Sequence, residues 1–140
     1  MYWKIKTDLD NNCLEENKYI KKHRFISQVG NEVITEDKYT NGPDVFFRWK
    51  TTVLRDSYHL DFILLNPEQC GQKFHYGAIQ LEAVKQQTRV TQVAYFDFVG
   101  ASLWVNYPWS GGMVDFLKYT VYWEQEMVLR LKDRYSGESE

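Results

Sequence analysis

The chain has 140 residues, a formal net charge of −2, 44% hydrophobic residues and 26% charged residues. These values are typical of one globular domain and exclude a disordered chain. The absence of a basic excess argues against nucleic-acid binding. No apolar run of about 18 residues is present to span a membrane. Residues 1–6 also lack the apolar core of a signal peptide, so we expect a cytoplasmic protein.

The first 23 residues are the least regular part of the sequence. Residues 2–9 are compatible with a strand, and residues 14–23 with a short helix. The second segment carries a basic cluster, which includes His23 and Arg24. We interpret this cluster as the solvated face of the helix in preference to an anion site.

Residues 24–107 alternate between β-prone runs and turn signals such as Asn41-Gly42-Pro43. Within these runs apolar side chains recur at every second position, as at Phe47, Trp49 and Val53. The predicted strands cover residues 24–29, 32–39, 44–55, 58–64, 72–84, 88–99 and 101–107. Because the intervening turns are short, consecutive strands should pair antiparallel.

The last segment, residues 110–135, has the period of a helix. It contains no proline or glycine from residue 113 onward, so a helix of about 35 Å is expected there. Two adjacent apolar stripes lie along this helix, and the second consists of Phe116, Tyr119, Trp123 and Met127. An apolar surface this wide needs more cover than the sheet gives. The candidates are, in order, the N-terminal segment, a ligand and a second copy in a homodimer.

These elements predict an α+β domain over residues 1–140, in which a curved antiparallel sheet of about six to seven strands grips one long C-terminal helix. Four features carry a resemblance to a known superfamily. They are the order of elements, the quartet Thr88-Arg89-Val90-Thr91, the run from Phe74 to Leu81, and Gly111-Gly112-Met113. Together they resemble the START-like (SRPBCC) superfamily, also called the polyketide cyclase/dehydrase and lipid-transport superfamily. Residues 1–23 depart from its pattern, because they leave too little room for the usual strand and two helices.

The resemblance implies a cavity between the sheet and the C-terminal helix that binds a small hydrophobic or aromatic molecule. The sequence is 16% aromatic, which suits such a cavity, although plain core packing explains most of the rings. The residues expected to line it are Phe47, Trp49, Phe62, Tyr76, Trp104, Tyr107, Phe116 and Trp123.

Two side chains are candidates for acid–base chemistry in that cavity. Glu124 lies within the apolar stripe of the helix, where a carboxylate needs a partner, and Arg89, His75 and Arg48 are the candidates. A structural ion pair is the preferred interpretation of Glu124, and a satisfied core histidine that of His75. If both converged on one reacting atom, the protein would be a cyclase- or dehydratase-like enzyme. A third alternative is an interaction module without a ligand.

The sequence predicts neither a metal site nor a cofactor. The three histidines, His23, His59 and His75, lack the spacing that directs two imidazoles at one ion. Neither glycine-rich phosphate-binding motif is present. Cys13 and Cys70 are expected to be free thiols in a reducing compartment.

Overall fold

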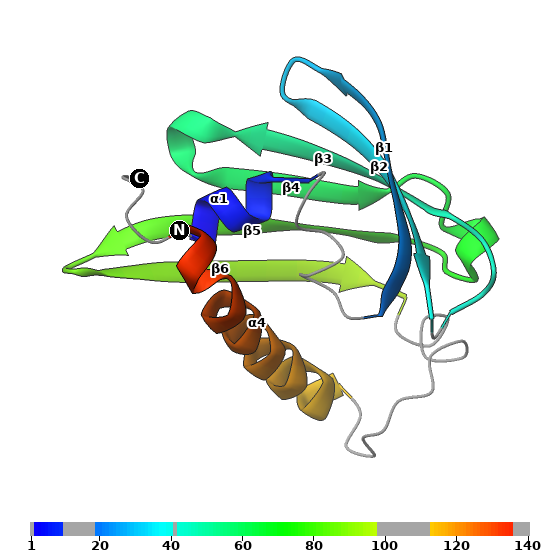
Figure 1. Ribbon diagram of the computed structural model, residues 1–140. Helices are drawn as coiled ribbons and strands as arrows, with labels where there is room; N and C mark the ends of the chain where they lie inside the picture. The colour runs from blue at the N-terminus through cyan, green and yellow to red at the C-terminus, as the bar shows by residue number, and fades with distance from the viewer. Residues whose placement is uncertain (1, 10–18, 41, 98–112, 136–140) are drawn as a thin grey trace.

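The computed structural model describes residues 2–9, 19–40, 42–97 and 113–135 (Figure 1). The described part is an α+β fold, as predicted. It contains two helices, α1 (Tyr2–Thr7) and α4 (Met113–Tyr135), and two short 3-10 helices, η1 (Arg55–Ser57) and η2 (Glu68–Cys70). The strands are β1 (Ile20–Val29), β2 (Glu32–Tyr39), β3 (Phe47–Leu54), β4 (His59–Leu64), β5 (His75–Val84) and β6 (Gln87–Phe96).

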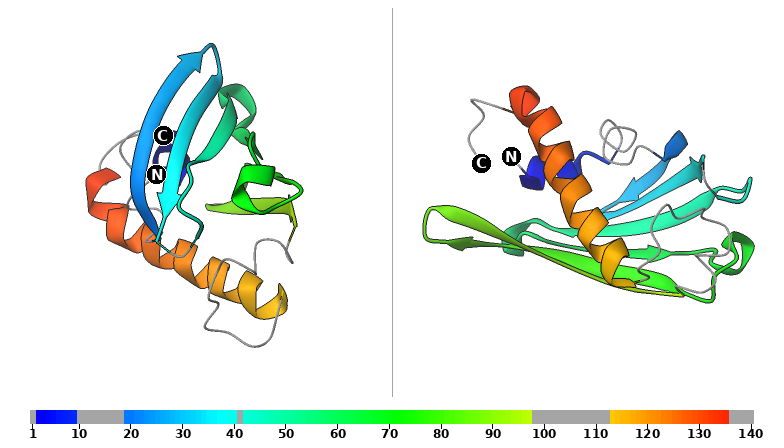
Figure 2. Two further views of the ribbon diagram at one scale, coloured as in Figure 1. Left: turned by 90° about the vertical axis from the view of Figure 1, so that its right-hand side faces the viewer. Right: turned by 90° about the horizontal axis from the view of Figure 1, so that it is seen from below.

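The six strands form one antiparallel sheet in chain order, which confirms the predicted pairing. Gly30 (φ 60°) and Lys85 (φ 59°) begin the tight turns of the β1–β2 and β5–β6 hairpins. Positive φ at this position lets a two-residue turn match the twist of the strands. The sheet is strongly curved, and its first strands stand at an angle to its last ones (Figure 2). The predicted strand over residues 101–107 lies outside the described residues.

One face of the sheet carries the apolar core. Phe47, Thr51 and Val53 of β3 are buried, and so are Leu60 and Leu64 of β4, which confirms the predicted alternation. We call this face the concave face and the opposite one the convex face. The backbone of Gly77 lies close to its neighbours on the concave face. A Cβ atom there would meet the Val93 carbonyl oxygen and would lie 2.7 Å from Cζ of Phe62. Glycine is therefore required at this point of the sheet.

The N-terminal segment differs from its prediction. Residues 2–7 form a helix and not a strand, because Tyr2 and Trp3 pack together against a cluster of Leu60, Ile79 and Leu81 on the sheet. A helical turn brings both rings to that cluster, whereas successive residues of a strand would point to opposite sides. The helix expected over residues 14–23 is wrong at its end, because residues 20–23 belong to β1. Tyr19 lies in a turn before β1, and residues 14–18 lie outside the described residues.

Both helices lie on the same side of the sheet (Figure 2). The predicted helix over residues 113–135 is confirmed. Two residues of the second apolar stripe have described side chains, and both are covered. Met127 is buried, and the Trp123 ring meets Tyr19 edge-on at 5.6 Å. Tyr19 belongs to the N-terminal segment, the cover that was ranked first. The side chains of Phe116 and Tyr119 lie outside the described part.

Candidate functional site

Aromatic rings gather on the concave face around His75. The register pairs Thr35 of β2 with Trp49 of β3, and His75 of β5 with Phe96 of β6. The Trp49 ring meets His75 edge-on at 5.0 Å, and the Phe96 ring stacks on the imidazole at 5.0 Å. Phe62 lies edge-on to both Trp49 and His75. We call Trp49, Phe62, His75 and Phe96 the aromatic wall.

The imidazole in this wall is neutral. Burial lowers the pKa of His75 from its ordinary value of 6.5 to about 4. Its Nδ1 lies 3.1 Å from the amide oxygen of Gln72, which is itself buried. An amide oxygen only accepts, so Nδ1 carries the proton and Nε2 carries a lone pair. The wall therefore presents one polar acceptor atom among apolar rings.

A second histidine, His23, also points to the concave face, although the sequence predicted that it lies on a solvated helix face. His23 of β1 pairs with Asp37 of β2, with His23 Nδ1 and Asp37 Oδ1 2.5 Å apart. The two side chains are only 5% and 8% exposed. Burial raises the pKa of Asp37, and it outweighs the lowering by the hydrogen bond and charge of His23. His23 Nε2 is buried and has no hydrogen-bond partner.

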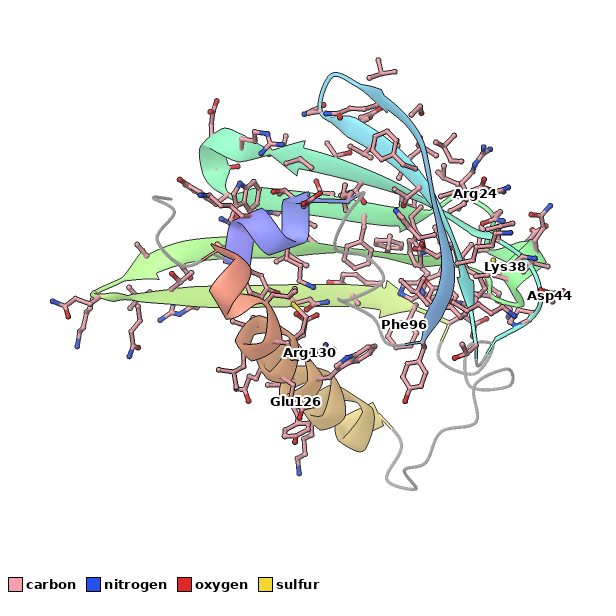
Figure 3. The ribbon with its side chains drawn as sticks, in the orientation of Figure 1. Arg24, Lys38, Asp44, Phe96, Glu126 and Arg130 are labelled. Carbon is pink, nitrogen blue, oxygen red and sulfur yellow. The ribbon has the colours of Figure 1, made fainter. Side chains whose placement is uncertain are left out.

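The basic cluster around His23 is thus divided between the two faces of a strand, which corrects its interpretation as one helix face. Arg24 pairs with Glu36 at 2.9 Å, and Lys38 pairs with Asp44 at 3.2 Å. Figure 3 shows Arg24, Lys38 and Asp44 on the side of the β1–β2 hairpin that faces away from the helices. His23 has the opposite orientation because side chains alternate along a strand.

Glu124 forms a structural ion pair, which was the preferred interpretation. Its carboxylate accepts hydrogen bonds from Lys6 Nζ at 2.9 Å and from the Tyr2 hydroxyl at 3.2 Å. The expected partners Arg89, His75 and Arg48 were wrong: Arg89 pairs with Glu82 and Arg48 lies near Glu36. No hydrogen bond joins Glu124 to His75 in the described part of the chain. The structure therefore does not bring the predicted acid and base together.

The structure places the expected ligand-binding residues in different surroundings. Trp49 and Phe62 lie on the concave face, within the aromatic wall. Phe47 is 1% exposed and packs among Leu64 and Cys70, so it is a closed core residue. Tyr76 does not lie where it was predicted to line the cavity. It follows His75 in β5 and therefore points to the convex face, where it is exposed and stacks on Tyr95. Trp104 and Tyr107 lie outside the described residues, as does the side chain of Phe116. Trp123 contacts Tyr19.

A groove of about 750 Å³ opens at the turn end of the β1–β2 hairpin. Val33 and Val53 lie on its concave-face side, and Thr7 and Asp8 at the end of α1 form its opposite rim. Phe25 also lines it and is the register partner of Thr35, which pairs with Trp49. None of the four aromatic-wall residues lines the groove, so the two features are related only through the register of Phe25, Thr35 and Trp49. The volume of the groove is in the range of small-molecule sites.

The remaining chemistry-bearing residues add no site. In residues 2–9, 19–40, 42–97 and 113–135, no group of three or more His, Cys, Asp or Glu side chains is placed to hold a metal ion. Cys70 is a free thiol that is fully buried, and burial raises its pKa to about 12, so it is unreactive. Neither of the described helices is long and apolar enough to cross a bilayer.

Comparison with known proteins identifies the fold only. No family model and no curated protein matches the sequence. Among solved structures, the chain is similar to the protein TTHA0849 from Thermus thermophilus, with a TM-score of 0.56. The two chains are 12% identical, and the match covers 92% of this chain and 82% of the other. At this identity the likeness concerns the arrangement of sheet and C-terminal helix and carries no function.

Proposed function

We propose that this protein is a START-like domain that binds a small, largely apolar molecule on the concave face of its sheet. The observation that carries the proposal is the aromatic wall, in which three rings surround one neutral imidazole. Apolar walls with a few well-placed polar atoms are typical of small-molecule sites. The order of strands and terminal helix, which resembles that superfamily, supports the same proposal.

Two further features support binding on this face. The groove of about 750 Å³ offers space beside the row that contains Trp49. The C-terminal end of α1, with Thr7 and Asp8, forms one rim of that groove. We therefore place the ligand between the sheet and the helices, with its apolar body against the wall. Binding without catalysis is favoured over an acid–base enzyme, because Glu124 is held by Lys6 and Tyr2.

The test begins with native mass spectrometry of the protein purified from its source. We expect a co-purified small molecule, which is released on denaturation. The same spectra report whether the protein is a monomer or a homodimer. If no molecule is retained, the stripped protein should still bind small aromatic probes such as naphthalene. The absence of both results, with no probe dissociation constant below about 1 mM, contradicts the proposal.

Adjacent residues of β6 provide a matched pair of variants for locating the site. Phe96 stacks on His75 at 5.0 Å on the concave face, and Tyr95 stacks on Tyr76 at 5.3 Å on the convex face. Each variant, Phe96→Ala or Tyr95→Ala, removes one stacked ring from the same strand. We expect Phe96→Ala to weaken probe binding at least about tenfold and Tyr95→Ala to leave it unchanged. The reverse order would place the site on the convex face.

A further inference from the structure

The buried pair of His23 and Asp37 has an unfilled hydrogen-bonding position. Asp37 occupies Nδ1 of the imidazole, and Nε2 is buried without a partner. A buried polar atom that makes no hydrogen bond costs about 1–3 kcal/mol, and most such atoms in native proteins are satisfied. Each exception calls for an explanation, and a bound ligand or water that fills the position is one of them.

The surroundings of the pair match the face on which we place the ligand. The register puts His23, Asp37 and Phe47 in one row across β1, β2 and β3. The next row holds Phe25, Thr35 and Trp49, of which Thr35 is buried and Trp49 belongs to the aromatic wall. His23 and Asp37 thus lie one row away from the wall, on the same face of the sheet.

The charged neighbours of the pair point away from it. Arg24 lies over the Phe46 ring at 3.6 Å and Lys38 over the same ring at 4.8 Å, and Arg24 pairs with Glu36. These residues alternate in sequence with His23 and Asp37 and therefore occupy the convex face. Among the described residues, Asp37 is the charged side chain that forms a hydrogen bond and ion pair with His23.

The chemistry of the pair selects the polar group of the ligand. A protonated imidazole beside an ionised Asp37 presents an N–H at Nε2, which needs an acceptor; an unprotonated imidazole presents a lone pair, which needs a donor. A hydroxyl group satisfies either state, because it both donates and accepts. A carboxylate only accepts and matches the protonated imidazole alone, and an ammonium only donates and matches the neutral imidazole alone, so a hydroxyl is the group that fits both states.

We propose that His23 Nε2 anchors the hydroxyl group of an aromatic ligand, such as a phenol or naphthol, with Asp37 fixing the orientation of the imidazole. This assignment rests on the proposed function, which supplies the apolar body of the ligand. It names the ligand class: a flat apolar molecule with one hydroxyl group at the end that reaches β1 and β2. Neither His75 nor Glu124 takes part in this contact.

The experiment compares 2-naphthol with naphthalene, which has the same apolar body without the hydroxyl. Titration calorimetry or tryptophan fluorescence should show that the wild-type protein binds 2-naphthol at least about tenfold more tightly. In His23→Asn the amide N–H can replace Nδ1 beside Asp37, but Nε2 is absent. We expect this variant to bind both molecules equally, at the affinity that the wild type has for naphthalene. The matched control is His59→Asn, which removes an imidazole from the convex face and should keep the tenfold preference.

The outcomes separate the anchor from the proposed function. Equal binding of the two molecules by the wild type, or an unchanged preference in His23→Asn, overturns the anchor and leaves the binding function standing. Binding of neither molecule by the wild type overturns both. If His23→Asn does not fold, nitrogen-15 NMR of the wild type decides the question. Saturation with 2-naphthol must shift the Nε2 resonance of His23 and not that of His59, and an unmoved His23 resonance overturns the proposal.

Discussion

The sheet carries two histidine–aspartate pairs, one on each face, and they differ in what completes them. On the convex face, His59 Nε2 lies 2.9 Å from Asp61 and Nδ1 lies 2.7 Å from the amide oxygen of Gln80. On the concave face, His23 has Asp37 at one ring nitrogen and nothing at the other. Water reaches the exposed pair, whereas the buried pair depends on the protein or a ligand. The same two residue types therefore form an ordinary surface contact in one place and an incomplete polar site in the other.

The pKa values of the histidines and of Asp37 also differ between the two faces of the sheet. Hydrogen bonds to the Asp61 carboxylate and to the Gln80 amide oxygen raise the pKa of His59, because both acceptors favour the charged imidazole, which donates from both nitrogens. Burial dominates on the other face, where it raises the pKa of Asp37 and lowers that of His75. Each change on the concave face disfavours a charge, which is the expected effect of an apolar environment.

Removal of the carboxylate should give the largest difference between the two pairs. Asp37→Ala leaves a buried imidazole without its partner, so we expect a loss of about 3–5 kcal/mol in the free energy of unfolding. Asp61→Ala removes a partner that is half exposed and should cost less than about 1 kcal/mol. Urea unfolding followed by tryptophan fluorescence measures both. Equal losses would show that burial does not distinguish the pairs.

His75 and His59 should change stability with pH in opposite directions, because the pKa of His75 is lowered and that of His59 is raised. Between pH 6.5 and about 4, the unfolded chain protonates His75 while the native protein does not. Stability therefore falls as the pH falls through this window, by about 3 kcal/mol when the native imidazole is finally charged. The raised pKa of His59 acts in the other direction: its contribution is fully present below pH 6.5 and is lost as the pH rises through its native pKa.

His75→Asn isolates the concave-face contribution. Its side-chain amide can still donate to Gln72 but does not titrate, so the difference in stability between pH 7 and pH 4 should be smaller than in the wild type. His59→Asn is the control and should leave the acid limb unchanged. Parallel stability curves for wild type and His75→Asn would mean that His75 titrates normally. Proton NMR gives a direct check, because the His75 ring should remain unprotonated at pH 5.5.

The close approach at Gly77 gives a smaller effect that is also specific to the concave face. In Gly77→Ala the new methyl group would meet the Val93 carbonyl oxygen and the Phe62 ring. We expect a loss of about 2–3 kcal/mol, because the carbonyl belongs to the paired backbone of β6 and cannot easily move. Ala78→Gly, at the next position and on the convex face, should cost about 1 kcal/mol through chain entropy alone. Thermal or urea unfolding that gives equal losses would show that β6 relaxes around the methyl group.

The sequence predicted the order of the strands and the C-terminal helix because alternation and helical periodicity persist over many residues. The sequence did not predict that His23 points to the concave face, because this orientation depends on one extra residue in β1. The β1–β2 register shifts between Phe25 and Ser27, where Ile26 forms a bulge. Without that extra residue, Arg24 would face inward and His23 outward, because a shift of one residue exchanges the faces of a strand. A bulge has no reliable sequence signature here.

The candidate site was predictable only in part for a related reason. Trp49 and Phe62 were assigned to the correct face by alternation, and the same rule, applied from His75, would have placed Tyr76 on the convex face. The partner of Glu124 could not be found from periodicity, because Lys6 lies 118 residues earlier in the chain. That contact exists because α1 is a helix packed beside α4, which the apolar pattern of residues 2–9 did not indicate.

The smallest expected effect concerns Glu124, whose ion pair is partly covered by the two helices. Lys6 and Glu124 have side chains 10% and 25% exposed, whereas the convex-face pair of Arg89 and Glu82 is 60% and 51% exposed. We expect Glu124→Gln to lower the free energy of unfolding by about 1 kcal/mol and Glu82→Gln to change it by less than about 0.5 kcal/mol. Neither variant should alter the affinity for naphthalene or 2-naphthol, because Glu124 acts by holding α1 against α4. A loss of probe binding in Glu124→Gln, with stability unchanged, would instead place this carboxylate in the ligand site and restore it as a candidate acid.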